Sequence, residues 1–206
     1  MSHTLYAHPF ACSLAPHIVL VQHAIPAEVR WLPRGPGRQI PDAAYDAIHP
    51  RRKVPALVLP DGTTVTELIV VLLHLEEAHG PPRTRDEHRQ LLTWLSFLAT
   101  ELHQGVLGPT FDPAAPPESV ADARSRLMPP VLSHVAAGLA DPLAPIGGDE
   151  PTAVDALLFW CELLLNVRWP DALPPALAAH RKMMLGRPLV RTVLAREEQA
   201  RTELSA

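Results

Sequence analysis

The chain has few of the features that mark secreted or membrane proteins. Its 206 residues include only two cysteines, Cys12 and Cys161, which lie far apart. Two such thiols do not make a disulfide framework, so a reducing cytoplasm fits better than a secreted setting. The chain starts without the basic-then-apolar pattern of a signal peptide, and no window approaches ~18 uninterrupted apolar residues. We therefore expect a cytoplasmic protein with no membrane partner.

The chain also has no large excess of charge of either sign. The formal net charge is −4 and the basic residues do not gather into a strong cluster, so the sequence gives no electrostatic footprint for nucleic acid. Apolar residues make up 47% of the chain and charged residues 19%, as in ordinary globular proteins. The length permits one large domain or two small ones.

Two motifs that would indicate a cofactor or a metal are incomplete. Residues 35–37 (Gly-Pro-Gly) lack the third glycine and the strand-to-helix context of a dinucleotide-binding loop. His74 and His79 are five residues apart, which places them on different faces of a helix and not together on a zinc ion. We therefore predict no metal and no dinucleotide.

Proline, by contrast, is abundant, and its placement outlines the first half of the chain. There are 24 prolines, roughly double the average usage. Between the proline-rich segments, the apolar patterns predict short strands and two helices in the order β-α-β, a linking segment, then β-β-α. The predicted strands are 4–7, 27–32, 54–59 and 63–65, and the predicted helices are 13–23 and 67–78.

The second half of the chain reads as helical throughout. Residues 80–85, rich in proline and glycine, break the preceding helix and resemble a linker. We predict long helices over 86–107 and 119–139, the second bent at Pro129 and Pro130, and three more after residue 152. The first of these three begins with Thr152 and Asp155 in the spacing of a capping box. The predicted domains are 1–80 and 87–206, joined by a linker at 81–86.

The most informative position is Cys12, which with Ser13 opens the first predicted helix. Unpaired backbone N–H groups and the positive end of the helix dipole converge there, and such a position lowers the pKa of a thiol. The pattern is therefore typical of sulfur chemistry. Alternatively, Cys12 is a small apolar residue that fills the helix start, as we expect for Cys161 in its apolar helix.

Five blocks, in order along nearly the whole chain, resemble the glutathione transferases, and in detail the bacterial beta-like class with an active-site cysteine. They are residues 6–17 (YAHPFACSLAPH), 49–57 (HPRRKVPAL), 61–67 (DGTTVTE), 94–103 (WLSFLATELH) and 152–155 (TAVD). The resemblance implies a thioredoxin-like α/β N-terminal domain and an all-α helical C-terminal domain. It also implies a homodimer that uses glutathione as cosubstrate, with no metal.

The resemblance assigns sulfur chemistry to Cys12, Ser13 and His103. Cys12 would lie near the glutathione sulfur, and the Ser13 hydroxyl would stabilise its thiolate. His103, of near-neutral pKa, would handle protons or stabilise the thiolate; the alternative is an ordinary histidine on a helix surface. Phe10, with Leu107 and Phe111, is expected to line the pocket for the electrophile.

The remaining predicted contacts bind the rest of glutathione. A cis peptide before Pro55 would leave the Val54 backbone free to pair with the cysteinyl unit as an added strand, whereas an ordinary trans proline would simply open a strand. Glu67 would accept from the γ-glutamyl ammonium, although a carboxylate in a first helical turn needs no ligand. The other predicted binding residues are Arg34, Lys53, Leu68 and Ser96, with Arg38 as a further basic candidate.

Three positions depart from the family pattern. Leu68 stands where serine is common, Ser96 where asparagine is common, and Gln104 where lysine is usual. The resemblance therefore predicts attack of the glutathione thiolate on a small electrophile, or glutathione-dependent disulfide or peroxide reduction. A binding or interaction protein that keeps the fold but has lost efficient catalysis is the alternative.

Overall fold

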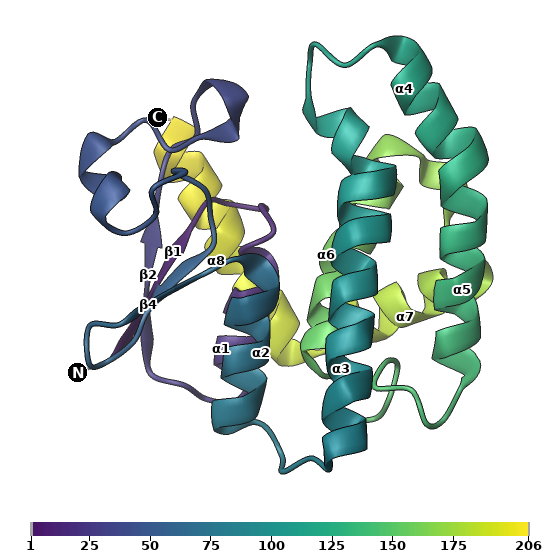
Figure 1. The fold of residues 1–206 in the computed structure, drawn as a ribbon, viewed down its shortest axis with the longest axis horizontal. Helices are drawn as coiled ribbons and strands as arrows, with labels where there is room; N and C mark the ends of the chain where they lie inside the picture. The colour runs from purple at the N-terminus through teal and green to yellow at the C-terminus, as the bar shows by residue number, and fades with distance from the viewer. Residues whose placement is uncertain (1, 206) are drawn as a thin grey trace. The chain divides into compact units, whose positions relative to one another are not determined.

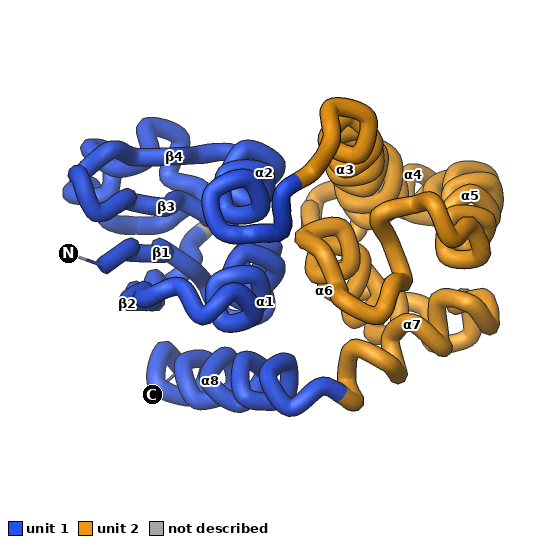
Figure 2. The backbone as a smooth tube through the Cα atoms, turned by 90° about the horizontal axis from the view of Figure 1, so that it is seen from below, with its two compact units in different colours: residues 1–82, 187–206 blue, residues 83–186 orange. Residues whose placement is uncertain are grey.

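The computed structural model describes residues 2–205, which divide into two units. The first comprises residues up to 82 together with 187 onward, and the second comprises 83–186 (Figure 2). Among the described residues, no helix is both long enough and apolar enough to cross a membrane.

The first unit contains a four-stranded sheet of order β2-β1-β3-β4 (Figure 1). Its strands are β1 (His3–Ala7), β2 (Ala27–Trp31), β3 (Ala56–Val58) and β4 (Thr64–Thr66). β1 pairs in parallel with β2, which requires a crossover, whereas the β1–β3 and β3–β4 pairs are antiparallel. The predicted β-α-β and β-β-α order is confirmed.

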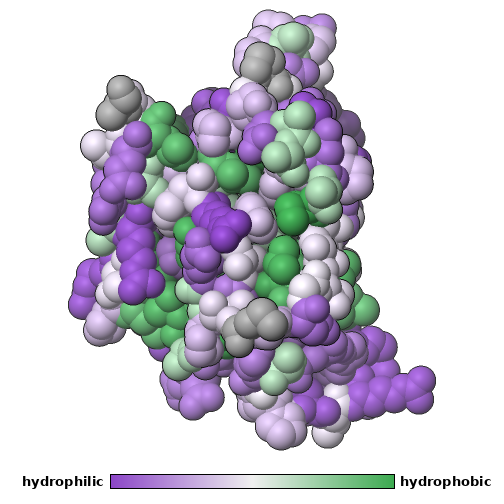
Figure 3. Space-filling model, turned by 90° about the vertical axis from the view of Figure 1, so that its left-hand side faces the viewer, coloured by the Kyte–Doolittle hydropathy of each residue, from purple (hydrophilic) through white to green (hydrophobic). Residues whose placement is uncertain are grey.

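Helices α1 (Leu14–Gln22) and α2 (Leu68–His79) lie on one face of this sheet and pack against each other (Figure 2). α1 forms the crossover between β1 and β2, and its residues from Leu14 to Leu20 are all buried. α1 also packs against α8 (Pro188–Ser205), the last helix of the chain. Part of the surface of the molecule is drawn in Figure 3, where hydrophilic side chains are interspersed with smaller hydrophobic areas, as is usual for a water-exposed face.

The second unit is helical. It contains α3 (Arg85–Phe97), α4 (Pro117–Asp122), α5 (Met128–Ala140), α6 (Ala153–Arg168) and α7 (Pro175–Gly186). α3 continues without a break into a π-helical segment over Leu98–Leu107, so the predicted helix 86–107 is present but its winding changes. α4 likewise runs through a π-helical turn, Ala123–Leu127, into α5, where Pro129 and Pro130 occupy the first turn. Prolines lack an N–H, so a change of winding before them is expected.

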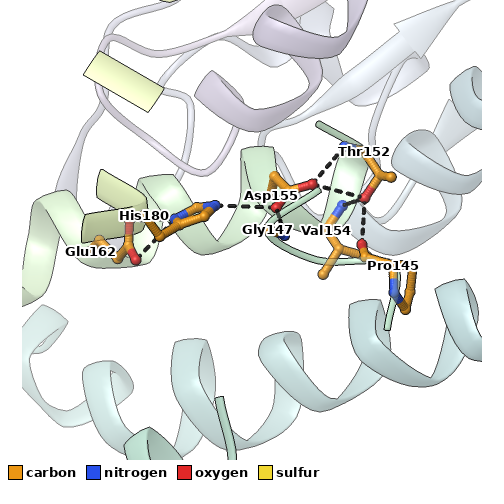
Figure 4. Close-up of polar contacts among 7 residues, drawn as sticks. All are labelled: Pro145, Gly147, Thr152, Val154, Asp155, Glu162 and His180. Carbon is orange, nitrogen blue, oxygen red and sulfur yellow. Dashed lines mark hydrogen bonds and ion pairs between the residues drawn. The ribbon is translucent and has the colours of Figure 1, made fainter. Parts of the chain in front are cut away.

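A buried polar cluster holds the start of α6 (Figure 4). Thr152 and Asp155 form the predicted capping box, so this prediction is confirmed. Asp155 also accepts from the Gly147 N–H at 2.6 Å and lies 3.1 Å from His180 Nε2 on α7. The other ring nitrogen of His180 is 2.9 Å from a carboxylate oxygen of Glu162. All three titratable side chains are buried.

Candidate active site

The loop between β1 and α1 places Cys12. The Ser13 hydroxyl, fully buried, donates to the His8 carbonyl and accepts from the His8 N–H, both at 3.2 Å. Ala11 N–H donates to the same carbonyl at 3.0 Å. These bonds fix the loop that carries the thiol. The Ser13 hydroxyl is engaged in them, whereas the Ser13 N–H is one of the groups that lower the pKa of the Cys12 thiol.

The prediction that the helix start lowers the Cys12 pKa is wrong. Cys12 is only 8% exposed, and burial raises the pKa of its thiol. The charges of Arg34 and Arg38 and the N–H groups of Cys12 and Ser13 act in the opposite direction, but their effects are smaller. The N–H groups at the helix start do favour the Cys12 thiolate, as the sequence indicates, but the desolvation of the thiol has the larger effect on its pKa. Burial therefore favours the protonated form of this thiol.

The cysteine thiol contacts the segment before β3. Cys12 Sγ donates to the Val54 carbonyl at 3.4 Å, and the Val54–Pro55 peptide bond is cis, as the resemblance implies. A small apolar cluster supports this segment. Buried Ile40, Tyr45 and Ala56 form its centre, and Val54 packs against them. The Tyr45 hydroxyl also donates to the Lys53 carbonyl at 2.9 Å.

Cationic side chains surround this thiol-bearing corner. Burial lowers the pKa of Arg34, and nearby Arg38 lowers it further. Burial also lowers the pKa of Lys53, as do Arg38, Arg34 and Arg51, while Lys53 Nζ donates to the Gly37 carbonyl at 2.6 Å. The Arg34 Nε is buried and has no hydrogen-bond partner among the described residues. Cations that repel one another beside an unsatisfied donor favour the binding of an anion.

Glu67 and Leu68 lie at the start of α2. Glu67 precedes the helix with a φ of 68°, a left-handed conformation uncommon outside glycine, and its side chain does not cap the helix. Instead, its carboxylate accepts from the Arg51 guanidinium in an exposed ion pair. Leu68 is the first residue of α2 and is partly buried. Of the apolar run that follows, Val71, Leu72 and Leu75 are in the core, whereas Val70 is 51% exposed.

Two predicted site residues belong to the second unit. His103, 7% exposed, lies in the π-helical segment and packs edge-on against Trp160, with ring centroids 4.6 Å apart. It also contacts the ring of Phe111 at 5.8 Å. Ser96 is partly buried on α3. π-Helical turns are frequent at functional sites, which favours a role for His103. The roles of His103 and Ser96 in a shared site stay predictions.

Sequence reasoning missed two residues of the first unit. Arg51 lies in the block 49–57, which gives it no role of its own, yet it pairs with Glu67. Glu197 of α8, fully buried, accepts from the Phe10 N–H at 2.7 Å and from His17 Nδ1 at 2.8 Å. It thereby holds the loop that precedes Cys12. No local signal marks Glu197, since its partners are more than 100 residues away.

Comparison with known proteins identifies the family. Residues 11–78 match the family model "Glutathione S-transferase, N-terminal domain". The chain is 31% identical over 204 residues to glutathione S-transferase GstA of Escherichia coli O157:H7, covering 94% of this chain and 98% of that protein. The chain belongs to the glutathione S-transferase family. The expected architecture, a thioredoxin-like sheet followed by a helical domain, is thereby confirmed.

Solved structures agree with this assignment. A glutathione transferase from Methylococcus capsulatus superposes with a TM-score of 0.82 at 29% identity, covering 96% of this chain and 99% of that one. A sphingomonad glutathione S-transferase complexed with glutathione gives 0.77 at 27% identity, covering 95% and 98%. A beta-class enzyme from Sphingomonas chungbukensis gives 0.76 at 27%, covering 94% and 98%. Within residues 2–205, no group of three or more His, Cys, Asp or Glu side chains is placed to hold a metal ion.

Proposed function

We propose that this glutathione S-transferase conjugates glutathione to small electrophiles. The observation that carries the proposal is the corner where the buried Cys12 thiol meets the Val54 carbonyl, with Arg34 and Arg38 close enough to act on the sulfur. Glutathione has two carboxylates and one ammonium around a central thiol. A cationic corner with a single acidic anchor, Glu67, complements that pattern of charges.

Each part of the tripeptide has a proposed place. The Val54 backbone pairs with the cysteinyl unit as an added strand, and Glu67 accepts from the γ-glutamyl ammonium. Arg34, Arg38 and Lys53 attract the carboxylates. The glutathione sulfur then lies beside Cys12, where the thiol that donates to Val54 turns to donate to the thiolate instead. Ser13 contributes its N–H.

The raised pKa of Cys12 favours conjugation over disulfide exchange. Exchange requires a Cys12 thiolate as nucleophile, and burial disfavours that form. A protonated Cys12, by contrast, is a hydrogen-bond donor for the thiolate that attacks the electrophile. Disulfide or peroxide reduction is thus the less favoured branch. The electrophile is expected beside Phe10.

A glutathione-binding protein without efficient catalysis is the second candidate, and Leu68 favours it. Leucine offers no side-chain donor to the γ-glutamyl carboxylate. One missing hydrogen bond to a charged group costs about 1.5–3 kcal/mol. This corresponds to roughly 10- to 100-fold weaker binding.

Two measurements separate these candidates. The protein should be retained on immobilised glutathione and should turn over 1-chloro-2,4-dinitrobenzene with glutathione; retention without turnover would select the binding protein. Absence of binding at millimolar glutathione would exclude both. The variant Cys12→Ser keeps a hydroxyl donor and should retain much of the conjugating activity, whereas reduction of a disulfide substrate through Cys12 would be lost. We further propose a cytoplasmic homodimer that detoxifies electrophiles; light scattering during size-exclusion chromatography tests the dimer.

A further inference from the structure

We propose that Arg51 binds the α-carboxylate of the γ-glutamyl unit and so replaces the donor that Leu68 lacks. The inference rests on the proposed function, because it concerns the same glutathione site. It names a residue that determines specificity for the zwitterionic end of the ligand.

Arg51 and Glu67 form an exposed ion pair at the start of α2. Both side chains are exposed, at 67% and 57%, so both are accessible to a ligand. The Arg51 Nη2 donates to one oxygen of the Glu67 carboxylate, while a guanidinium has five N–H donors and a carboxylate a second oxygen. The pair therefore presents further donors beside a further acceptor.

The charges of this ion pair complement those of the γ-glutamyl end of glutathione. The γ-glutamyl end carries an ammonium and a carboxylate on the same carbon atom, so its opposite charges are held side by side. Glu67 and Arg51 in contact present the complementary charges side by side as well. A guanidinium can also donate to both oxygens of a carboxylate in parallel hydrogen bonds. A free α-amino acid end is thus the group that this pair fits.

The turn before β3 holds Arg51 in place. The Arg51 N–H donates to Nδ1 of His49 at 3.2 Å, and His49 is buried and stacks on Tyr45. The next residue, Arg52, has a φ of 51° and pairs with Asp46 instead. The two adjacent arginines therefore pair with different carboxylates, Arg51 with Glu67 and Arg52 with Asp46. Of these two arginines, Arg51 is the one that contacts the start of α2, where Leu68 is the first helical residue.

Arg52 consequently provides a matched control. It is a neighbouring arginine in an ion pair with a carboxylate, at 35% and 47% exposure, and the proposed site does not include it. Exposed ion pairs contribute little to stability, so both Arg51→Ala and Arg52→Ala should fold. Far-ultraviolet circular dichroism and thermal unfolding check that they do.

Calorimetric titration with glutathione is the test. Arg51→Ala should weaken binding about tenfold, whereas Arg52→Ala should leave it unchanged. Leu68→Ser should restore much of the loss when it is added to Arg51→Ala, because serine supplies a new donor. Titration with γ-aminobutyryl-cysteinyl-glycine, which lacks the α-carboxylate, should show no difference between the unaltered protein and Arg51→Ala.

Equal losses for Arg51→Ala and Arg52→Ala, or the same loss with the analogue, would mean that Arg51 acts through its charge alone, and the inference would fall. Full binding by Arg51→Ala would overturn it while leaving the proposed function in place. If the unaltered protein does not bind millimolar glutathione, the proposed function itself falls, and the inference with it.

Discussion

Replacing His180 by glutamine should reveal the buried charge cluster of the helical unit. His180 lies between Asp155 and Glu162, 3.1 Å from one carboxylate and 2.9 Å from the other (Figure 4). Burial by itself lowers the pKa of His180, but the hydrogen bonds and charges of the two carboxylates raise it to about 9. Burial raises the pKa of Glu162 to about 7, against the opposing effect of His180. One imidazolium thus lies between two buried carboxylates.

The magnitude follows from this pairing. Removing one partner of a buried ion pair costs about 3–5 kcal/mol. For a chain of this length that lowers the melting temperature by about 6–20 °C. The cost should also depend on pH. The folded pKa of His180 lies above its unfolded value of 6.5, so its stabilisation is fully present below pH 6.5 and is lost as the pH rises through about 9. That loss amounts to about 3 kcal/mol.

Urea unfolding followed by tryptophan fluorescence is the assay, since Trp94, Trp160 and Trp169 report on the helical unit. The difference between the unaltered protein and His180→Gln should be large at pH 6 and much smaller at pH 9.5. An equal destabilisation by His180→Gln at pH 6 and pH 9.5 would refute the ionic pairing.

Three further outcomes are expected. Alkylation of Cys12 by iodoacetamide, followed by mass spectrometry, should be slow at pH 7 with a midpoint above that of a free thiol, because burial raises its pKa; a fast reaction at pH 7 would contradict this. Glu197→Ala removes the carboxylate that accepts from the Phe10 N–H and should cost about 1–3 kcal/mol; unchanged hydrogen exchange of that amide would argue against the contact. Gly138→Ala places a Cβ 2.3 Å from the Trp94 ring and should lower stability by about 1–3 kcal/mol, so an unchanged melting temperature would show that the helices separate freely.

The sequence predicts the order of elements well because the signals are local. Strand alternation, helical periodicity and the proline and glycine breaks each span a few residues, and the capping box at Thr152 and Asp155 lies within one turn. The π-helical winding at 98–107 was missed, since the apolar stripe of that segment is also compatible with an α-helix. The pairing of Asp155 with His180 was missed because it depends on how α6 and α7 pack.

The candidate site, like the fold, could be predicted only where its signals are local in the sequence. Resemblance located Cys12, the cis Val54–Pro55 bond and Glu67, because these lie within short motifs. The ionisation of Cys12 could not be derived from its motif, since burial is produced by the fold as a whole. The motif that contains Glu67 does not contain its partner Arg51, which lies 16 residues earlier in the chain. Motifs identify the residues, whereas packing sets their charges.

The same electrostatics links binding to the proposed chemistry. Arg34 and Arg38 act against the raised pKa of the Cys12 thiol, and the carboxylates of bound glutathione would offset part of their charge. Binding should therefore raise the Cys12 pKa further. The thiol would remain a donor over the pH range in which the cosubstrate thiol ionises, and the two sulfurs would not compete for the same role. A protonated Cys12 can donate a hydrogen bond to the glutathione thiolate, which is the nucleophile in conjugation.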